Sequence, residues 1–296
     1  MTNISRRDAF AVTTAALVGG LSVSAAEPKT RIAVVVGPSG HPPGTHEVAA
    51  GGRLIKQALE SIKGLTIHAD VISEWPADAI SLNDVSTFVF IGDLFPAAVM
   101  PLAHKILADL DVFMKKGAGM VCLHYATGLE AKHVAEDGAH PLLGWIGGYF
   151  ATRCKHHQSV AKVFQKATIE PTKAEHPVNR GWKPFTLHDE PYINNYFGKD
   201  GPAKNVTILA TAELPPEKPK AEAVAWAVTR EDTGRGAGIV MPHFYRNWKD
   251  DDLRKLIFNA IVWSAKLDVP KDGVSVTLPE LETFKPASVE PVPKKK

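Results

Sequence analysis

Apolar residues in the first half of the chain occur in short continuous runs that alternate with segments of helical periodicity. Four of these runs are bounded by glycine, proline or polar residues and predict buried strands: 31–37, 65–72, 85–91 and 120–123. Two segments between them place apolar side chains on one helical face: 46–61 and 102–116. The order strand, helix, strand, strand, helix, strand predicts an α/β fold with a doubly wound, mostly parallel sheet.

The second half is less regular, and its middle, 130–196, is rich in loop residues. Residues 206–212 and 223–229 predict two strands, which could form an antiparallel pair across a Pro/Lys-rich loop. A short strand at 238–241 and an amphipathic helix over 250–266 follow. We expect this helix to complete the domain.

The two ends of the chain differ from its middle. Arg6 and Arg7 precede an apolar stretch that ends in small residues at Ala26, which predicts a twin-arginine signal peptide over 1–26. A short membrane anchor is the alternative, but the apolar run is shorter than the roughly 20 residues that a spanning helix needs. We therefore expect an exported, periplasmic protein without stable membrane insertion.

The mature domain is predicted to cover 27–269. The remaining 270–296 form a tail rich in proline, lysine and glutamate without helical periodicity, and its last ten or so residues are expected to be disordered.

Composition narrows the classes of partner. Of the 296 residues, 45% are hydrophobic and 22% charged, as in an ordinary globular protein. The formal net charge of +2 gives no reason to expect a nucleic acid partner. Cys122 and Cys154 are the two cysteines, so a cysteine zinc site of the CxxC type is excluded.

Polar side chains follow several of the predicted strands at the point where each strand ends. In an open α/β sheet, ligands bind at this carboxyl edge. The residues that should arrive there are His41 and His46 after the first strand, Asp93 after the third, His124 after the fourth and His243 after the last. The irregular segment with Asp189 and Glu190 could fold over the same edge.

Two chemistries suit this set of side chains. Imidazoles and carboxylates together are ligands for zinc or a similar divalent ion. The same groups without metal could act as general acids and bases on a polyhydroxyl substrate. Structural roles are the alternatives: His41 could be an exposed loop residue, His46 could lie at a helix start, and Glu190 could accept backbone hydrogen bonds.

Cys122 is a further candidate, as the nucleophile of a cysteine hydrolase. A nucleophile elbow needs small neighbours so that the strained turn can form. Val121 and Leu123 flank this cysteine, which favours a buried strand residue instead.

Five stretches together resemble the ThuA-like (trehalose utilisation) family. They are SGHPPGTHE at 39–47, GAGMVCLH at 117–124, LLGWIGGYF at 142–150, HPVNRGWKPFTLHDEPY at 176–192, and 236–266. The similarity is to exported members of the planctomycete type. It implies a flavodoxin-like, class I glutamine-amidotransferase-like fold and a role in carbohydrate catabolism, with 3-keto-glycosides as the expected substrates. Amidotransferase chemistry is not implied, because His124 stands where those enzymes carry cysteine.

These observations lead to one principal hypothesis, an exported enzyme that acts on a small carbohydrate by acid–base or metal-assisted elimination or hydrolysis. We assign His124, Glu190 and Asp189 to catalysis and His41, His46 and His243 to a divalent metal, with zinc as the first choice. Four aromatic residues are expected to stack on the sugar: Trp145, Tyr149, Tyr192 and Trp248. The alternative is a carbohydrate-binding or accessory protein without catalysis.

Overall fold

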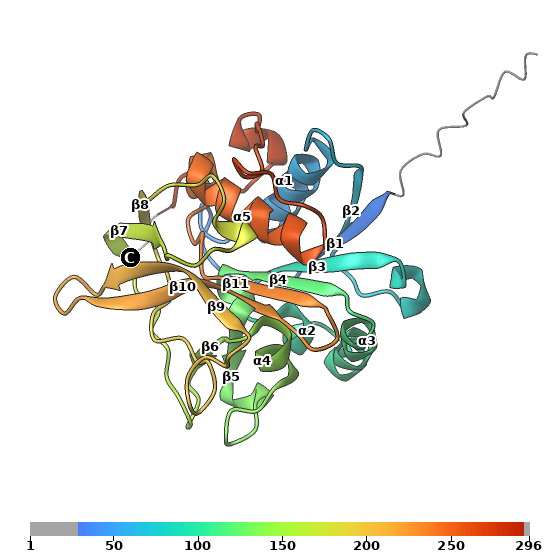
Figure 1. Cartoon of the computed structure of the whole chain (residues 1–296), viewed down its shortest axis with the longest axis horizontal. Coiled ribbons are helices and arrows are strands. Elements are labelled where there is room, and N and C mark those ends of the chain that lie inside the picture. Colours follow the sequence, from blue (N-terminus) through green and yellow to red (C-terminus); the bar gives the residue numbers. More distant parts are fainter. Residues whose placement is uncertain (1–28, 293–296) are drawn as a thin grey trace, which may run out of the picture.

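A nine-stranded sheet runs through the part of the chain that the structure describes, residues 29–292 of a computed structural model (Figure 1). The predicted signal peptide, 1–26, lies outside these residues. Five neighbouring strands of the sheet are parallel. In spatial order they are β2 (Ile67–Ile72), β1 (Thr30–Val36), β3 (Val85–Ile91), β4 (Gly119–Leu123) and β11 (Arg235–Ile239).

Four antiparallel strands extend the sheet beyond β11. In order they are β10 (Lys220–Thr229), β9 (Val206–Leu214), β7 (Phe164–Pro171) and β8 (Phe185–Asp189). A separate small parallel pair joins β5 (Gly128–Glu130) to β6 (Phe150–Thr152). β11 is therefore the strand where the parallel and antiparallel halves meet.

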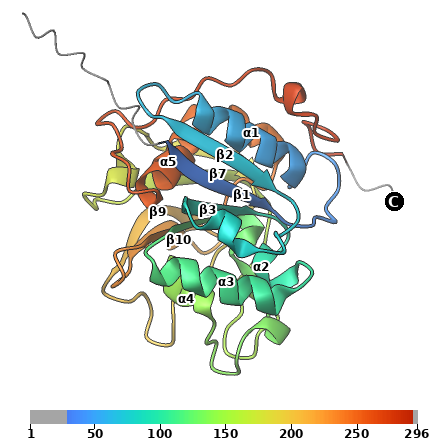
Figure 2. The same ribbon diagram turned by 90° about the vertical axis from the view of Figure 1, so that its right-hand side faces the viewer.

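Helices cover both faces of the parallel half (Figures 1 and 2). One face carries α1 (Val48–Glu60) and α5 (Asp251–Ser264), and the other carries α2 (Pro96–Val99), α3 (Ala103–Lys115) and α4 (Pro141–Ile146). Successive residues of β1 enter opposite layers: Ile32 and Val34 join the core under α1 and α5, whereas Ala33 and Val35 join the other core. Burial on both faces explains why this strand is a continuous apolar run.

Two glycines let α1 lie close against the sheet. A Cβ atom at Gly51 would come within 2.7 Å of the Ile91 side chain, and one at Gly52 within 2.6 Å of Val36. The close approach fixes the start of α1, and the loop before it, at the carboxyl edge of β1 and β3.

The structure confirms the α/β class and its parallel central strands. The predicted strands and helices recur within a few residues, the strand over 85–91 coincides with β3, and the pair β9 and β10 is antiparallel as proposed. The final strand ends at Ile239 rather than 241. The antiparallel edge formed by β7 and β8 was not predicted, because these strands lie in the irregular middle of the chain.

The C-terminal segment, residues 270–292, differs from the expected tail. It packs against the domain through Val274, Leu281, Phe284 and Val289, all of which are buried. Arg53 of α1 donates hydrogen bonds to the carbonyl oxygen of Phe284 at 2.9 and 2.7 Å. The expectation of disorder from about residue 287 is wrong as far as Val292, whose N–H donates to the carbonyl oxygen of Pro43 at 3.0 Å. Residues 293–296 lie outside the described part.

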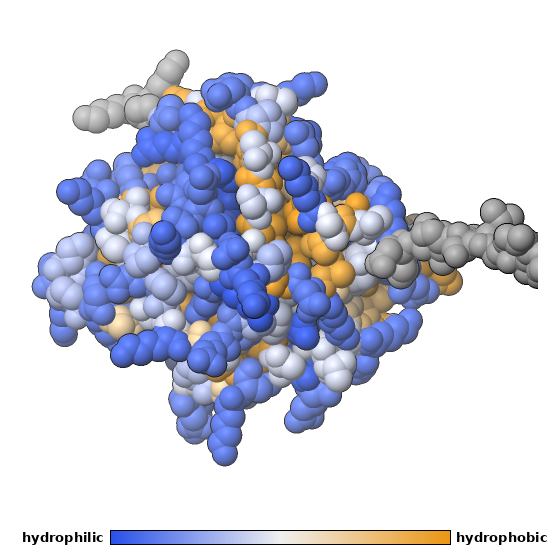
Figure 3. Space-filling model, turned by 45° about the horizontal axis from the view of Figure 1, so that its top comes forward, coloured by the Kyte–Doolittle hydropathy of each residue, from blue (hydrophilic) through white to orange (hydrophobic). Residues whose placement is uncertain are grey.

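The outer surface is mixed in character. In the view that brings the α1 side forward, hydrophilic residues form the rim, with a patch of apolar residues between them (Figure 3). Within residues 29–292, no helix combines the length and the apolar composition required to cross a membrane.

Candidate metal centre

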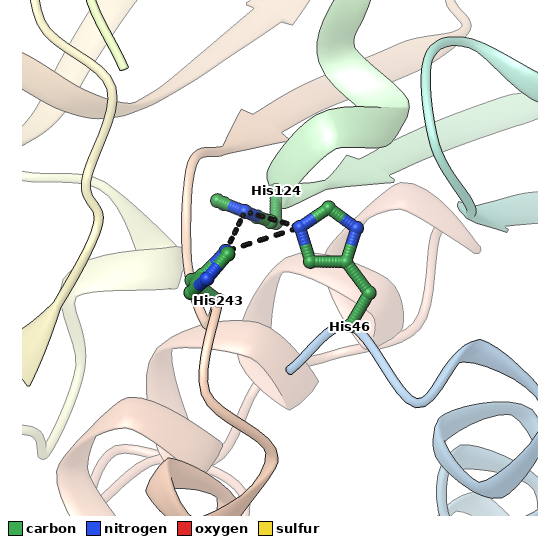
Figure 4. Close-up of side chains that lie close together, drawn as sticks. All are labelled: His46, His124 and His243. Atoms are coloured by element: carbon green, nitrogen blue, oxygen red, sulfur yellow. Dashed lines mark hydrogen bonds between the residues drawn. The ribbon is translucent and has the colours of Figure 1, made fainter. Parts of the chain in front are cut away.

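Three histidines from distant parts of the chain meet beyond the carboxyl edge of the sheet (Figure 4). His46 lies between β1 and α1, His124 follows β4, and His243 lies in the turn after β11. Nε2 of His46, Nε2 of His124 and Nδ1 of His243 are 3.1 Å from one another in all three pairs. We call these three atoms the imidazole triangle. Their side chains are only 2%, 6% and 9% exposed, so the triangle is shielded from water.

Hydrogen bonds on the far side of two rings determine where their protons lie. Nδ1 of His46 contacts the carboxylate of Asp93, and Nδ1 of His124 is 3.1 Å from the carbonyl oxygen of Val240. A carboxylate and a carbonyl can only accept, so each neutral ring carries its proton on Nδ1. The Nε2 atoms of both rings therefore present lone pairs to each other at 3.1 Å, which is repulsive unless a cation lies between them.

The pKa values of these histidines favour the form that can bind a metal. Burial lowers the pKa of His46 and lowers that of His124 well below its ordinary value. Burial, with the neighbouring His46 and His41, lowers the pKa of His243 to about 3. All three rings are thus neutral near pH 7, as metal ligation requires.

The spacing also fits a single ion. Nitrogens that share one zinc ion at 2.0–2.1 Å in a tetrahedral arrangement lie about 3.4 Å apart. The edges of the imidazole triangle, 3.1 Å each, are close to this value. Three protein ligands with a further position left open are typical of catalytic rather than structural zinc sites.

Glu190 and Tyr192 lie beside the triangle and could reach a group bound there. Oε2 of Glu190 is 3.4 Å from Nδ1 of His243 and 4.0 Å from Nε2 of His124. Burial, together with the charge of Asp189, raises the pKa of Glu190 to about 7. The hydroxyl of Tyr192 is 3.1 Å from Nε2 of His124, and its ring stacks on that histidine.

His41 lies outside the imidazole triangle. Its Nδ1 is 2.7 Å from Oδ2 of Asp93, and its ring stacks on His46 at a centroid distance of 3.6 Å. Its side chain is 32% exposed, which makes it the outermost histidine of the cluster. His41, His46 and Asp93 are close enough to hold an ion together, but hydrogen bonds to Asp93 already use both Nδ1 atoms.

Asp93 is the shared acceptor that orients both rings. Burial alone would raise its pKa, but hydrogen bonds from His41 and His46 outweigh this and lower the pKa far below the ordinary range. The backbone N–H of Gly40 donates a further hydrogen bond to Oδ2 at 2.8 Å. A carboxylate behind a ligating histidine fixes its ring orientation and raises its basicity.

Asp189 supports the site from behind. Its side chain is fully buried, and Oδ1 accepts hydrogen bonds from the backbone N–H groups of His243 and Phe244 at 2.9 and 3.1 Å. Burial raises its pKa to about 6. The structure shows Asp189 holding the His243 turn through these backbone contacts, whereas its assignment to catalysis stays a prediction.

All four aromatic residues expected to stack on sugar are buried in the core. Trp145 is in α4, which packs so closely on β11 that a Cβ atom at Gly236 would lie 1.9 Å from the Trp145 carbonyl oxygen. Tyr149 is fully buried, with its hydroxyl donating to Gly138. Trp248 lines a cavity of about 10 Å³ behind the triangle and is 2% exposed. Tyr192 is 2% exposed as well, but its hydroxyl lies 3.1 Å from Nε2 of His124.

Tyr125 is an aromatic residue of the site that the sequence analysis did not identify. It follows His124 directly and is partly exposed, and its ring is edge-on to His41 and His46 at 6.1 and 6.0 Å. Its position directly after His124 was the feature of the sequence from which its place in the site could have been predicted.

The backbone at His124 has an unusual conformation. Its φ angle of 48° lies in the left-handed region, where residues other than glycine are uncommon. The hydroxyl of Thr127 donates to the His124 carbonyl oxygen at 2.6 Å and holds the turn. The turn directs the imidazole away from the strand and into the triangle.

Both cysteines are buried as free thiols. Burial raises the pKa of the Cys122 thiol well above its usual value, so it is protonated at neutral pH. This environment does not support the cysteine-hydrolase alternative.

Comparison with known proteins agrees with the fold. The family model for ThuA, described as trehalose utilisation, matches residues 32–264. No curated protein sequence matches the chain.

Among solved structures, a putative ThuA-like protein from Bacteroides uniformis is similar with a TM-score of 0.58 and 16% identity, over 86% of this chain and 98% of that one. A cytoplasmic protein from Salmonella typhimurium matches with a TM-score of 0.44 and 13% identity, over 83% of this chain and 99% of that one. A glutamine amidotransferase from Thermotoga maritima matches with a TM-score of 0.40 and 11% identity, over 79% of this chain and 91% of that one.

Proposed function

The chain belongs to the ThuA (trehalose utilisation) family, and from this premise we propose that it is an exported, metal-dependent enzyme that acts on oxidised sugars. The family associates the chain with carbohydrate utilisation. The metal, the reaction and the export are our proposals. The observation that carries the metal and the reaction is the imidazole triangle, in which two lone pairs face each other at 3.1 Å. Export rests on Arg6, Arg7 and the apolar stretch that follows them.

We assign the metal to His46, His124 and His243, with zinc as the ion that best suits three neutral imidazoles. When bound, the ion would supply Lewis-acid polarisation of a substrate oxygen. The three rings hold their positions through acceptors that lie outside the triangle: Asp93 for His46, the Val240 carbonyl for His124, and backbone contacts of Asp189 for the His243 turn.

The proposed reaction is elimination from a 3-keto-glycoside. The keto group acidifies the neighbouring C2–H, and Glu190 takes this proton as general base. The electron pair of the C–H bond forms a C1=C2 double bond as the glycosidic C1–O bond breaks. The leaving oxygen then receives the proton of the Tyr192 hydroxyl, and the proton that Glu190 has taken from C2 returns to Tyr192, so that both side chains regain their starting forms. Hydrolysis of the same glycosidic C1–O bond is the alternative reaction.

Solvent can approach the triangle from the side of His41, Asp93 and Glu190, whose side chains are 32%, 19% and 16% exposed. The partly exposed Tyr125 lies on the same side, against His41. We propose this side as the entrance for a small carbohydrate. The buried state of Trp145, Tyr149 and Trp248 argues against a non-catalytic sugar-binding protein that uses these aromatics as a platform.

The test combines metal analysis with turnover. The purified protein is expected to contain about one zinc ion per chain by elemental mass spectrometry, and to release a 2-hydroxy-3-keto-glycal from 3-keto-trehalose. His124→Ala should lose both properties, while His104→Ala, which changes an exposed histidine of α3, should keep both.

Glu190→Gln separates the base from the ligands. It should lower turnover by about 10²–10⁴-fold while metal content stays the same. Wild-type protein that neither binds a divalent metal nor turns over the keto-sugar would refute the proposal.

A further inference from the structure

We propose that Glu47 and the end of the C-terminal segment, residues 286–292, act together as a clasp that holds His46 in place and so determines metal affinity. This inference rests on the metal site proposed above. It concerns a part of the chain that is more than 200 residues away from His46 in sequence and contributes no ligand.

Glu47 directly follows His46 and precedes α1. Its φ angle of 36° lies in the left-handed region, so the backbone turns sharply between the histidine and the helix. A non-glycine residue holds this conformation only where surrounding contacts stabilise it. The contacts here come from the carboxylate of Glu47 itself.

The carboxylate joins two segments of the chain. Oε1 accepts hydrogen bonds from the backbone N–H of Gly44 at 2.8 Å and of Ser288 at 3.0 Å. Oε2 accepts one from the N–H of Ala287 at 2.8 Å. Hydrogen bonds to an ionised acceptor are about twice as strong as neutral ones. Glu47 thereby ties the loop before His46 to the C-terminal segment.

Further backbone contacts close the clasp around this loop. The N–H of Val292 donates to the carbonyl oxygen of Pro43 at 3.0 Å. The N–H of Tyr245 donates to the carbonyl oxygen of Gly44, also at 3.0 Å. Gly44 has a φ angle of 80°, and a Cβ atom there would lie 2.1 Å from the Glu290 carbonyl oxygen. The C-terminal segment therefore lies directly on the loop, and Tyr245 links the loop to the turn that carries His243.

The consequence is preorganisation. His46 Nε2 must stay within about 0.5 Å of its position for the three nitrogens to share an ion. With the clasp released, residues 38–47 have fewer contacts to hold them, and binding must then supply the ordering free energy. Loss of an outer support of a ligating histidine lowers metal affinity by about 10–100-fold, and we expect a change of this size.

The experiment measures zinc affinity of the full chain by competition with a chromophoric chelator, together with the zinc-induced shift in melting temperature. Glu47→Ala removes the acceptor, and truncation after Lys285 removes the donors. Each should weaken zinc binding by about 10–100-fold. Because the two changes share the contacts of Glu47 with Ala287 and Ser288, their combined effect should be smaller than the sum of the two single effects.

Two further variants keep the test interpretable. Glu47→Gln preserves the shape but offers an amide N–H₂ where one donor needs an acceptor, so an intermediate loss is expected. Glu282→Gln removes the same charge from an exposed side chain of the C-terminal segment, one that makes no hydrogen bond within residues 29–292, and should leave affinity unchanged.

Folded Glu47→Ala or truncated protein that binds zinc as tightly as wild type would overturn the clasp while leaving the metal site intact. Wild-type protein that binds no zinc would instead refute the proposed function, and with it the premise of the clasp.

Discussion

The sharpest test of the centre is Asp93→Asn, which changes the support of a ligand without touching the imidazole triangle. Asp93 uses both carboxylate oxygens: Oδ1 meets Nδ1 of His46, and Oδ2 accepts from His41 and from the N–H of Gly40. Asparagine keeps one oxygen and replaces the other by an N–H₂ group. One of these two sets of donors must therefore lose its acceptor.

Either orientation of the asparagine weakens the site. With N–H₂ toward His46, Nδ1 must accept, and the ring proton moves to Nε2, where it points into the triangle and blocks ligation. With N–H₂ toward His41, the N–H of Gly40 and the His41 ring lose their acceptor, and the loop before His46 loosens. Changes to such outer partners cost about 10–100-fold in metal affinity, which corresponds to about 1.4–2.7 kcal/mol.

The assay is a competition titration of zinc against a chromophoric chelator at pH 7.5. Asp109→Asn is the matched control, because Asp109 also accepts side-chain hydrogen bonds, from Trp75 and Lys105, but on α3. The control should bind zinc as wild type does. A zinc affinity of Asp93→Asn within twofold of wild type, in a folded protein, would refute the role that we give to Asp93.

Three other predictions concern two buried side chains, His140 and Cys122, and the predicted signal peptide. Burial lowers the pKa of His140 to about 4, and Nδ1 of this residue accepts a hydrogen bond from the N–H of Leu142 at 3.0 Å. Because the pKa in the folded state lies below that in the unfolded state, the contribution of His140 to the free energy of unfolding is complete above pH 6.5 and is lost as the pH falls toward 4. His140→Asn keeps an acceptor but has no group that titrates in this range. Between pH 7 and pH 4, the fall in its free energy of unfolding, measured with urea, should be smaller than that of wild type by up to about 3 kcal/mol. Native thiol labelling should leave Cys122 unmodified until the protein unfolds, and rapid modification would contradict its buried, protonated state. Replacing Arg6 and Arg7 by lysine should retain the protein in the cytoplasm of a host with twin-arginine export, as measured by fractionation; unchanged export would contradict the predicted signal.

Local sequence patterns predicted the parallel half of the sheet and most of the candidate site. Asp93, His124 and His243 lie just beyond strand ends and His46 lies in the loop that joins β1 to α1, at the edge where the rule for open α/β sheets places ligands. That rule describes the edge as a whole and cannot say which nitrogens meet. The separation of His41 from the imidazole triangle depends on the stacking of its ring and on Asp93, which are tertiary contacts.

The errors came where long-range packing outweighs local pattern. Trp145 lies between loop-forming glycines, yet α4 turns its ring into the core because β11 approaches it at Gly236. The C-terminal segment lacks any periodicity, and its apolar residues are held by α1 and by Glu47 rather than by a pattern of their own. Neither contact leaves a signal in the neighbouring sequence.

The position of the centre at the boundary between the two halves of the sheet has a consequence for how the proposed metal would be acquired. The paired nitrogens of the triangle are separated by 78, 119 and 197 residues along the chain. A zinc finger gathers its ligands within one short segment, so that the ion can template folding. Here β4 and β11 must already be paired, and the loop before α1 already docked, before any ion meets more than one imidazole. Binding of the proposed ion would therefore follow folding of the domain, and its removal should lower the stability of the whole domain rather than release a single loop.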